Sequence, residues 1–223
     1  MALIIGVTGS IATGKSTACR VMVEMGAIHC DADRLVHRLY DPGTEAFDRI
    51  VAIFGDEIVG SDGYIDRRQL GARVFGKPEQ MNKLTTAIGS IADAVKGVID
   101  EWNATLTAQD VAVLEAVNLV EAGYGQWCQQ VWLFACDNDI ARQRLAERNQ
   151  YSDEEVEQRL ASQRHWEERA PASDAVIFNN DTEERLISEV RSKFIHARHL
   201  WQVGELEPSR YLAWWEAKAA ESN

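Results

Sequence analysis

The segment GSIATGKST, which begins at Gly9, places two glycines, a lysine and several hydroxyl groups at the spacing Gly-x4-Gly-Lys-Ser. Gly9 and Gly14 permit backbone angles that turn successive N–H groups toward phosphate oxygens. Lys15 can reach the β- and γ-phosphates of a nucleotide, and the Ser16 hydroxyl can bind Mg²⁺. The pattern therefore predicts a phosphate-binding loop, with an ordinary structural turn before a helix as the alternative.

The residues on either side of the loop favour the first interpretation. The apolar run LIIGV precedes it and a stretch of helical spacing follows it, which is the strand–loop–helix order that such a loop requires. The start of the helix adds its positive N-terminal end. Thr17 supplies a further donor, which we expect at the α-phosphate. The predicted nucleotide contacts in this segment are Gly9, Ala12, Thr13, Gly14, Lys15, Ser16 and Thr17.

Two aspartates in the segment HCDADRLVH follow the next expected strand. Asp31 and Asp33 fall at the carboxyl end of that strand, and ligands bind at this edge of open α/β sheets. A carboxylate there can accept the proton of an attacking hydroxyl or orient the hydroxyl toward the γ-phosphorus. Alternatively, Asp31 caps the next helix and Asp33 is a solvated acid in its first turn. The spacing alone leaves both interpretations open.

The elements that must position these residues alternate between short apolar runs and longer stretches of helical spacing. This alternation predicts an α/β fold with a parallel sheet. Strands are expected at Leu3–Thr8, Ala27–Cys30, Val111–Ala116, Val131–Ala135 and Ala175–Phe178. Helices are expected at Ser16–Met25, Asp139–Asn149, Ser152–Glu168 and Thr182–His196, the third of which opens with a capping box.

Two regions depart from this alternation. Arg34–Asp100 contains no convincing strand, and we expect a helical insertion broken at DPGT, GSDGY and GKPE. The tail from Ala197 has a helical composition. We expect its aromatic residues, Trp201, Trp214 and Trp215, to pack onto the body of the protein.

Composition limits the class of protein and its partners. No apolar run approaches the ~18 residues of a membrane span, and the opening ALIIGV is too short for a signal peptide, so a cytoplasmic protein is expected. The net charge of -12 argues against a nucleic-acid partner. The scattered cysteines, and histidines without ligand-like spacing, predict buried thiols and no metal site beyond nucleotide-bound Mg²⁺; the cysteines are Cys19, Cys30, Cys128 and Cys136.

A series of segments, in a fixed order over about residues 3–195, resembles the dephospho-coenzyme A kinase family. The segments are GVTGSIATGKST, DADRLVH, DPGTEAFDRIVAIFG, DGYIDRRQLGARVF, EAVNLVEAGY, RLAERNQYSDEEVEQRLASQ and DAVIFNN. The resemblance implies transfer of the ATP γ-phosphate to the ribose 3′-hydroxyl of dephospho-coenzyme A, the last step of coenzyme A synthesis. It also implies a P-loop NTPase fold with a five-stranded parallel sheet, a helical coenzyme-binding insertion and a small helical lid.

The same resemblance implies a division of the chain and of its functional residues. A kinase core over residues 1–196 would include a substrate lobe at about 34–100 and a lid at about 137–170, and a Trp-rich helical extension would follow over 197–223. Asp33 would be the base or hydroxyl-orienting group, and Arg148 the lid arginine that neutralises the transferring phosphoryl group. Gln163 and Asn179 would lie near the nucleotide. The implied partners are ATP, Mg²⁺ and dephospho-coenzyme A, bound by a monomer or small homo-oligomer.

Several positions depart from the family pattern. Glu115 stands where the family has an aspartate that helps to hold Mg²⁺ through water. The other departures are Ser10 and Ala12 in the loop, Gly89-Ser90 for a His-Pro pair, Val117 and Asn118 after the third strand, and Asn149 and Trp166 in the lid region. They leave two alternatives open: a P-loop kinase for another small alcohol or nucleotide acceptor, and a non-catalytic nucleotide-binding homologue.

Two groups of arginines have both a functional and a plain interpretation. Arg67, Arg68 and Arg73 could meet a coenzyme diphosphate or lie on a solvated helical surface. Arg142, Arg144 and Arg148 recur along one helix and could form a lid clamp or pair with neighbouring acids such as Asp139 and Glu147. Of these, Arg148 is our prediction for the clamp.

Overall fold

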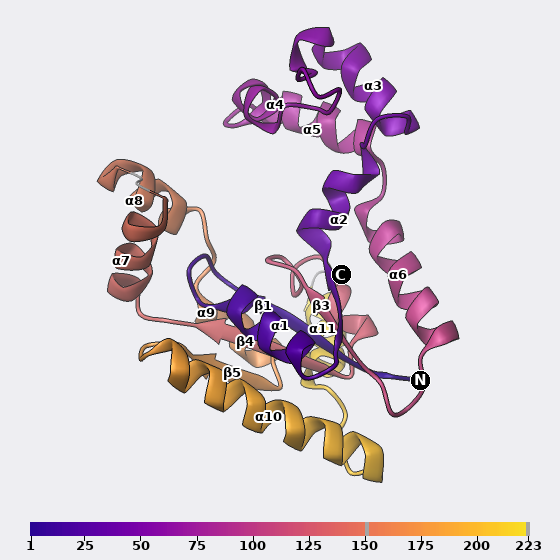
Figure 1. Ribbon diagram of the computed structural model, residues 1–223, viewed down its shortest axis with the longest axis vertical. Helices are drawn as coiled ribbons and strands as arrows, with labels where there is room; N and C mark the ends of the chain where they lie inside the picture. The colour runs from indigo at the N-terminus through magenta and orange to yellow at the C-terminus, as the bar shows by residue number, and fades with distance from the viewer. Residues whose placement is uncertain (150–151, 222–223) are drawn as a thin grey trace. The chain divides into compact units, whose positions relative to one another are not determined.

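The computed structural model describes residues 1–149 and 152–221, with the side chains of residues 148, 149 and 221 outside the description. The chain forms two compact units. One comprises Met1–Asp31 together with Ile99–Asn223, and the other comprises Ala32–Val98 (Figure 1).

The first unit contains a five-stranded sheet in the order β2-β3-β1-β4-β5, in which every pair of neighbours is parallel. Its strands run nearly continuously apolar through the centre, as expected for strands covered on both faces. The predicted strands are confirmed, with ends that differ by at most one residue: β1 Leu3–Gly9, β2 Ile28–Asp31, β3 Val111–Glu115, β4 Gln130–Ala135 and β5 Ala175–Phe178.

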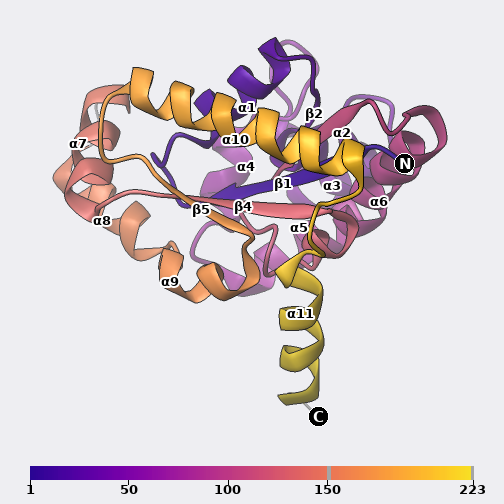
Figure 2. The same cartoon turned by 90° about the horizontal axis from the view of Figure 1, so that it is seen from below.

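Helices α1 (Lys15–Glu24) and α10 (Glu183–Val203) cover one face of this sheet, and α9 (Trp166–Arg169) and α11 (Arg210–Glu221) lie on the other side (Figure 2). Buried side chains from α1 and α10 join those of the central strands in one apolar core. The largest of them include Met22, Trp132, Phe134 and Phe194. This core fixes the position of the loop between β1 and α1, because both of its ends are anchored in it.

The predicted helix Ser152–Glu168 is wrong in its second half. Helix α8 spans Asp153–Ala161 and opens with the predicted capping box, in which Ser152 Oγ accepts from the backbone N–H of Glu155 at 3.3 Å. Its C-cap is Ser162, and the chain is already outside any helix at Arg164, whose carbonyl accepts a hydrogen bond from the Ser10 hydroxyl at 3.1 Å. A tertiary contact of this kind has no local sequence signal, and the chain resumes only as the short α9 and the 3-10 helix η3 (Ala170–Ala172).

The predicted end of the last core helix at His196 is also wrong. Helix α10 continues to Val203 and stops at Gly204, which has a φ of 76°. Gly204 is the first glycine after the predicted end, and it adopts the left-handed conformation that commonly closes helices. The boundary expected between residues 196 and 197 therefore falls inside a continuous helix.

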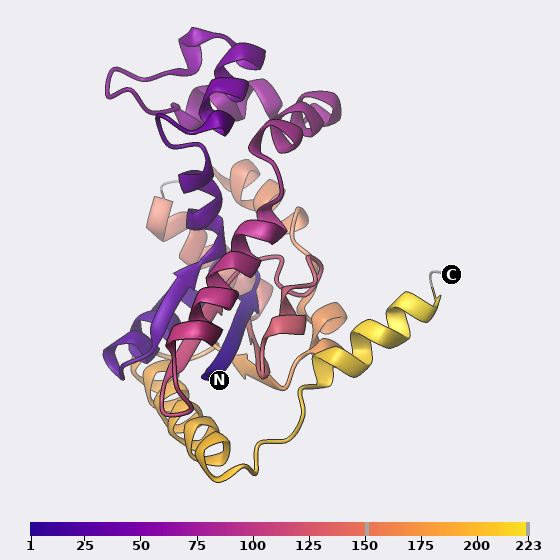
Figure 3. The same cartoon turned by 90° about the vertical axis from the view of Figure 1, so that its right-hand side faces the viewer.

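The tail packs onto the sheet unit through α11, whose C-terminal part extends from it (Figure 3). Tyr211 is fully buried, and its hydroxyl donates to the carbonyl of Val120 at 2.7 Å. Trp201 packs against the main core, while Trp214 and Trp215 are half-buried beside Tyr211. None of the described helices has the length and apolar character needed to span a membrane.

The second unit is helical, as the sequence predicts. Breaks fall at the three predicted turns, and two further breaks, at Gly55 and at Gly89-Ser90, are not among the predicted ones. It has its own core around Ile50, Phe54 and Ile58. Thr44 and Asp66 cap two of its helices through bonds from the backbone N–H groups of Phe47 and Arg68. Its elements are α2 Ala32–Leu39, α3 Glu45–Phe54, η1 Asp56–Ile58, α4 Arg67–Val74, α5 Pro78–Ile88 and the start of α6 Ile91–Thr105.

Candidate active site

The loop between β1 and α1 has a backbone that two of its glycines make possible. Gly9 has a φ of 147°, and a Cβ there would lie 2.3 Å from the carbonyl oxygen of Phe134. Gly14 has a φ of 91° and is the N-cap of α1, and a Cβ there would lie 2.4 Å from Asn179 Nδ2. A side chain at either position would displace backbone or a buried amide. The two glycines of the pattern are therefore required by this conformation.

Lys15 lies at the inner side of the loop. Its Nζ donates to the carbonyls of Gly9 and Ser10, at 2.8 Å in each case, and the residue is 9% exposed. These bonds hold the ammonium group beside the N-terminus of α1. A positive charge and the first N–H groups of a helix together form a binding site for the phosphates of a nucleotide.

Glu115 ends the third strand, at the edge of the sheet where the loop lies. The register pairs it with Val7 of β1 and with Asp31 of β2. Its Oε1 accepts from the Ser16 hydroxyl at 3.3 Å, and its Oε2 lies 3.1 Å from His29 Nε2. A carboxylate only accepts hydrogen bonds, so the proton of this contact belongs to the imidazole nitrogen.

Glu115 is buried but stays ionised. Burial raises the pKa of its carboxyl, but the hydrogen bonds from His29 and from the Cys19 thiol, with the charges of His29 and Lys15, outweigh burial and lower it. Ser16 and Glu115 thus present a hydroxyl and an anionic carboxylate side by side. Hard oxygen ligands of this kind suit Mg²⁺, so the residues present fit the ion that the loop predicts.

Asn179 connects the loop to the end of β5. Its buried Nδ2 donates to the carbonyl of Thr13 at 3.2 Å. Arg144, on α7 (Asn138–Asn149), donates to the Asn179 carbonyl at 2.9 Å and to its Oδ1 at 3.2 Å. The same guanidinium reaches the carbonyl of Ala12 at 3.3 Å. Sequence reasoning favours Arg148 over Arg144, and no spacing signal marks the contacts of Arg144.

A pocket of about 240 Å³ opens beside the loop. Its walls include Gln163, for which the family resemblance implies a position near the nucleotide, and Trp166, whose ring meets that of Phe178 edge-on with centroids 4.9 Å apart. Among the other lining residues are Ser10, Thr13, Cys136, Arg142 and Arg164. The pocket brings residues 160–166 next to the loop, in the same unit.

The remaining predicted residues fall in three places. Asp33 is an acid of the first turn of α2, in the second unit. Arg148 belongs to α7, and its side chain lies outside the described residues. Arg142 bonds Asp139 Oδ1 and Glu157 Oε1, at 2.6 Å in each case. Asp33 and Arg148 stay predictions.

The departures near the third strand and in the second unit have local roles. The carbonyl of Val117 accepts a hydrogen bond from the buried Thr8 hydroxyl at 2.9 Å. This bond does not require the proline that the family pattern has at position 117. Gly89 closes α5 with a φ of 90°, and Ser90 Oγ accepts from the N–H of Asp93 at 3.1 Å. Arg73 Nη2 lies 3.6 Å from Glu57 Oε2, while Arg67 and Arg68 are exposed.

A parallel sheet in this order, with a Gly-x4-Gly-Lys-Ser loop after its central strand, is the fold of the P-loop NTPases. The comparisons with known proteins agree. The dephospho-CoA kinase family model matches residues 3–184, so the chain belongs to that family. A dephospho-CoA kinase of Geobacillus kaustophilus is 37% identical over 205 residues, 92% of this chain and 100% of that protein. One from Geobacter sulfurreducens is 38% identical over 194 residues, 85% of this chain and 98% of that protein.

Solved structures show the same fold. The crystal structure of TT1252 from Thermus thermophilus superimposes with a TM-score of 0.67 at 28% identity, over 86% of this chain and 97% of that chain. Dephospho-CoA kinase from Campylobacter jejuni gives a TM-score of 0.62 at 21% identity, over 87% of this chain and 97% of that chain. The predicted fold class and family are thus confirmed.

Proposed function

We propose that this chain transfers the γ-phosphoryl group of ATP to the ribose 3′-hydroxyl of dephospho-coenzyme A, giving coenzyme A and ADP. The observation that carries the proposal is the arrangement around the loop. Lys15 is held at the inner side of the loop, and the Ser16 hydroxyl contacts the ionised Glu115, in a chain of the dephospho-CoA kinase family.

In this proposal the loop binds and orients ATP. The backbone N–H groups after Gly9 and the N-terminus of α1 hold the phosphates, and Lys15 exchanges its two carbonyl contacts for phosphate oxygens. Arg144 and Asn179 bond the backbone of the loop at Ala12 and Thr13, so the donors are positioned before the nucleotide arrives. Such preorganisation is a large part of phosphoryl-transfer catalysis.

Ser16 and Glu115 are the residues that we assign to Mg²⁺. The ion, when bound, neutralises charge on the β- and γ-phosphates. Glu115 replaces the family aspartate with a side chain one methylene longer, and that side chain reaches the hydroxyl of Ser16. The replacement therefore keeps the charge and the contact at this end of β3.

Asp33 is assigned the orientation or deprotonation of the 3′-hydroxyl, and Arg148 the neutralisation of the transferring group. Gln163 and Asn179 complete the nucleotide site. We place the reaction in the cytoplasm and expect a monomer or small homo-oligomer with no nucleic-acid or membrane partner. A kinase for another alcohol or nucleotide is the alternative that the substitutions at Gly89-Ser90 and Asn118 motivate.

The test measures ADP formed from ATP and Mg²⁺ with and without dephospho-coenzyme A, together with the position of the new phosphate. Acceptor-dependent turnover that yields the 3′-phosphate is expected. Lys15→Ala should lower kcat by roughly 10²–10³-fold, the usual cost of removing a donor to developing charge. Asp33→Ala should lower it by roughly 10²–10⁴-fold.

The matched control is Lys193→Ala, because Lys193 is a half-exposed lysine on α10 that lies 3.9 Å from Glu189. It should keep the parent activity. Turnover with another alcohol but not with dephospho-coenzyme A would favour the alternative kinase. Tight ATP binding with no acceptor consumed would favour the non-catalytic homologue.

A further inference from the structure

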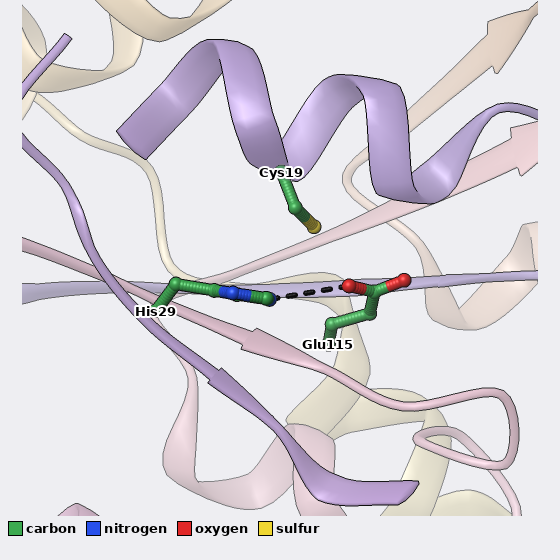
Figure 4. A group of neighbouring side chains, drawn as sticks. All are labelled: Cys19, His29 and Glu115. Atoms are coloured by element: carbon green, nitrogen blue, oxygen red, sulfur yellow. Dashed lines mark hydrogen bonds and ion pairs between the residues drawn. The ribbon is translucent and has the colours of Figure 1, made fainter. Parts of the chain in front are cut away.

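Three chemically different side chains meet beneath the first turns of α1. The Cys19 thiol comes from α1, the His29 imidazole from β2 and the Glu115 carboxylate from β3 (Figure 4). One ligand atom from each lies within 4.8 Å of the others. Figure 4 shows the Cys19 sulfur pointing toward the side of the His29–Glu115 pair, which is joined by the 3.1 Å contact.

The donor set differs from the one that Mg²⁺ prefers. Mg²⁺ takes oxygen ligands, whereas a thiolate, an imidazole and a carboxylate are ligands of Zn²⁺. Neighbouring ligands of a tetrahedral Zn²⁺ lie roughly 3.5 Å apart, given bonds of about 2.0–2.3 Å. The His29–Glu115 pair already has about this separation at 3.1 Å, and the sulfur, within 4.8 Å of both ligand atoms, needs to approach by at most about 1.3 Å.

The surroundings also suit a site with three protein ligands. Cys19 is 1% exposed and Glu115 is 8% exposed, so two ligands are held by the core. The His29 side chain is 26% exposed, which leaves a route to solvent and room for water as the fourth ligand. Lys15 opposes a cation here electrostatically, while Asp31 favours one.

We propose that Cys19, His29 and Glu115 form a binding site for Zn²⁺, and that its occupation withdraws the Glu115 carboxylate from Ser16 and inhibits phosphoryl transfer. The cation replaces the thiol proton, so Cys–SH and Zn²⁺ give a Zn²⁺-bound thiolate and one H⁺ released to the buffer. His29 Nε2 must also give up the proton that it shares with Glu115: a neutral ring takes the Nδ1–H tautomer, and an imidazolium releases a second H⁺. The inhibition rests on the proposed function, whereas the binding does not.

The thiol is not reactive on its own. Burial, followed by the nearby charge of Glu115, raises the pKa of Cys19, so the neutral thiol persists until a metal displaces its proton. Oxidation is therefore not expected to operate this site. A purely structural hydrogen-bonded cluster is the competing account, and it predicts no metal stoichiometry.

The binding test titrates the full-length chain with Zn²⁺ in competition with a chromophoric chelator, and separately with Co²⁺ as a spectroscopic probe. One equivalent of Zn²⁺ and a thiolate-to-Co²⁺ charge-transfer band are expected. Cys19→Ala and Cys19→Ser should each weaken Zn²⁺ binding by at least about 100-fold, more than the loss of an outer-shell partner. Serine keeps the size and hydrogen bond of the thiol, so it remains informative if alanine fails to fold.

Cys30→Ala is the matched control. Cys30 is the next residue of β2 after His29, so its side chain points to the opposite face of the sheet. It should bind Zn²⁺ like the parent. Absence of one-to-one binding by the parent, or equal binding by Cys19→Ser, would overturn the site.

The second arm measures ADP formation at saturating Mg²⁺ while Zn²⁺ is raised. The parent and Cys30→Ala should be inhibited at Zn²⁺ concentrations that fill the site, and Cys19→Ser should keep basal activity and escape inhibition. Equal inhibition of all three would overturn the coupling to Glu115. If no chain phosphorylates dephospho-coenzyme A, the proposed function fails while the binding arm still decides the metal site.

Discussion

Arg144 and Asn179 are joined by two hydrogen bonds from one guanidinium group: Nη1 donates to the Asn179 carbonyl at 2.9 Å and Nη2 to its side-chain Oδ1 at 3.2 Å. The amide of Asn179 then donates to the carbonyl of Thr13 in the loop. This chain of contacts holds the backbone of the loop at Thr13, and the same guanidinium also bonds the carbonyl of Ala12. Its effect on catalysis is therefore indirect, through the shape of the loop.

Arg144→Ala should weaken ATP binding and destabilise the fold. Asn179 is 6% exposed, so loss of the guanidinium leaves buried acceptors without a donor. This should lower the free energy of unfolding by about 1–3 kcal/mol. Urea unfolding and ATP titration by calorimetry measure the two effects. Arg191→Ala is the control, because Arg191 is an exposed arginine of α10 that lies 3.8 Å from the half-exposed Glu24, and it should change neither value appreciably. Equal effects of both variants would contradict this role of Arg144.

Two substitutions in the loop, Gly14→Ala and Ala12→Gly, each change one carbon atom and should have different effects on stability. Gly14→Ala forces a Cβ to within 2.4 Å of Asn179 Nδ2, so it should reduce both ATP affinity and thermal stability. Ala12 has a φ of 63°, which costs an alanine about 1–2 kcal/mol. Ala12→Gly relieves this strain but frees the unfolded chain by about 0.4–1 kcal/mol, so its stability should equal or slightly exceed that of the parent.

Differential scanning calorimetry of the two variants, with and without ATP, tests this pair. Gly26→Ala is a useful reference, since Gly26 also has a positive φ of 95° but no atom within 4 Å of the position that a Cβ would take. It should lose stability from backbone strain without losing ATP affinity. A Gly14→Ala protein that binds ATP like the parent would show that the loop tolerates the side chain.

Periodicity and turn residues are sufficient to predict the sheet, because buried parallel strands are continuous apolar runs between breaks. The loop is also predictable, because Gly9, Gly14, Lys15 and Ser16 lie in one short segment, and phosphate binding requires these residue types at this spacing. The ends of α8 and α10 are not. Helix α8 ends at Ser162 without a glycine or proline to mark the stop, and α10 continues through residues that carry no stop signal before Gly204.

The site around Glu115 is predictable only in part. Ser16 and Glu115 follow from the loop and the family pattern. The sequence predicts no metal cluster, because Cys19, His29 and Glu115 come from three separate elements, and 86 positions separate the histidine from the glutamate. Only the pairing of β2 with β3 and the packing of α1 bring them together. Arg144 is undervalued for the same reason, as its partners are backbone carbonyls distant along the chain.

His29→Ala should move acid inactivation to higher pH. The folded-state pKa of Glu115 is lowered, so its ionisation stabilises the protein above the unfolded pKa, near 4.5, and this stabilisation is lost as pH falls through the folded pKa. Removing His29 takes away a hydrogen bond and leaves the desolvation that raises the pKa. The loss should then begin at a higher pH than in the parent.

Thermal unfolding from about pH 3 to pH 7, and kcat/KM over the part of that range where the enzyme stays folded, measure the shift. His196→Ala serves as the control, because His196 is an exposed histidine of α10. If stability and kcat/KM fall over the same acidic pH range in His29→Ala and in the parent, His29 does not set the ionisation of Glu115.

Tyr211 should hold the tail helix in place without taking part in the reaction. Its ring packs against Gly125, where a Cβ would come within 2.4 Å of the ring, and its hydroxyl bonds the Val120 carbonyl. Tyr211→Phe removes one buried hydrogen bond and should cost about 1–2 kcal/mol. Tyr211→Ala also empties a fully buried ring site and should cost about 3–5 kcal/mol.

Equilibrium unfolding in urea gives these two values, and turnover per folded molecule gives the catalytic effect. Turnover should stay at the parent level in both variants, because α11 packs on η2 (Tyr124–Trp127), η3 and β4 rather than on the loop. Tyr64→Ala, at a tyrosine 52% exposed in the second unit, controls for removal of a phenol and should leave stability nearly unchanged. A fall in turnover for Tyr211→Phe at full folding would instead connect the tail helix to the active site.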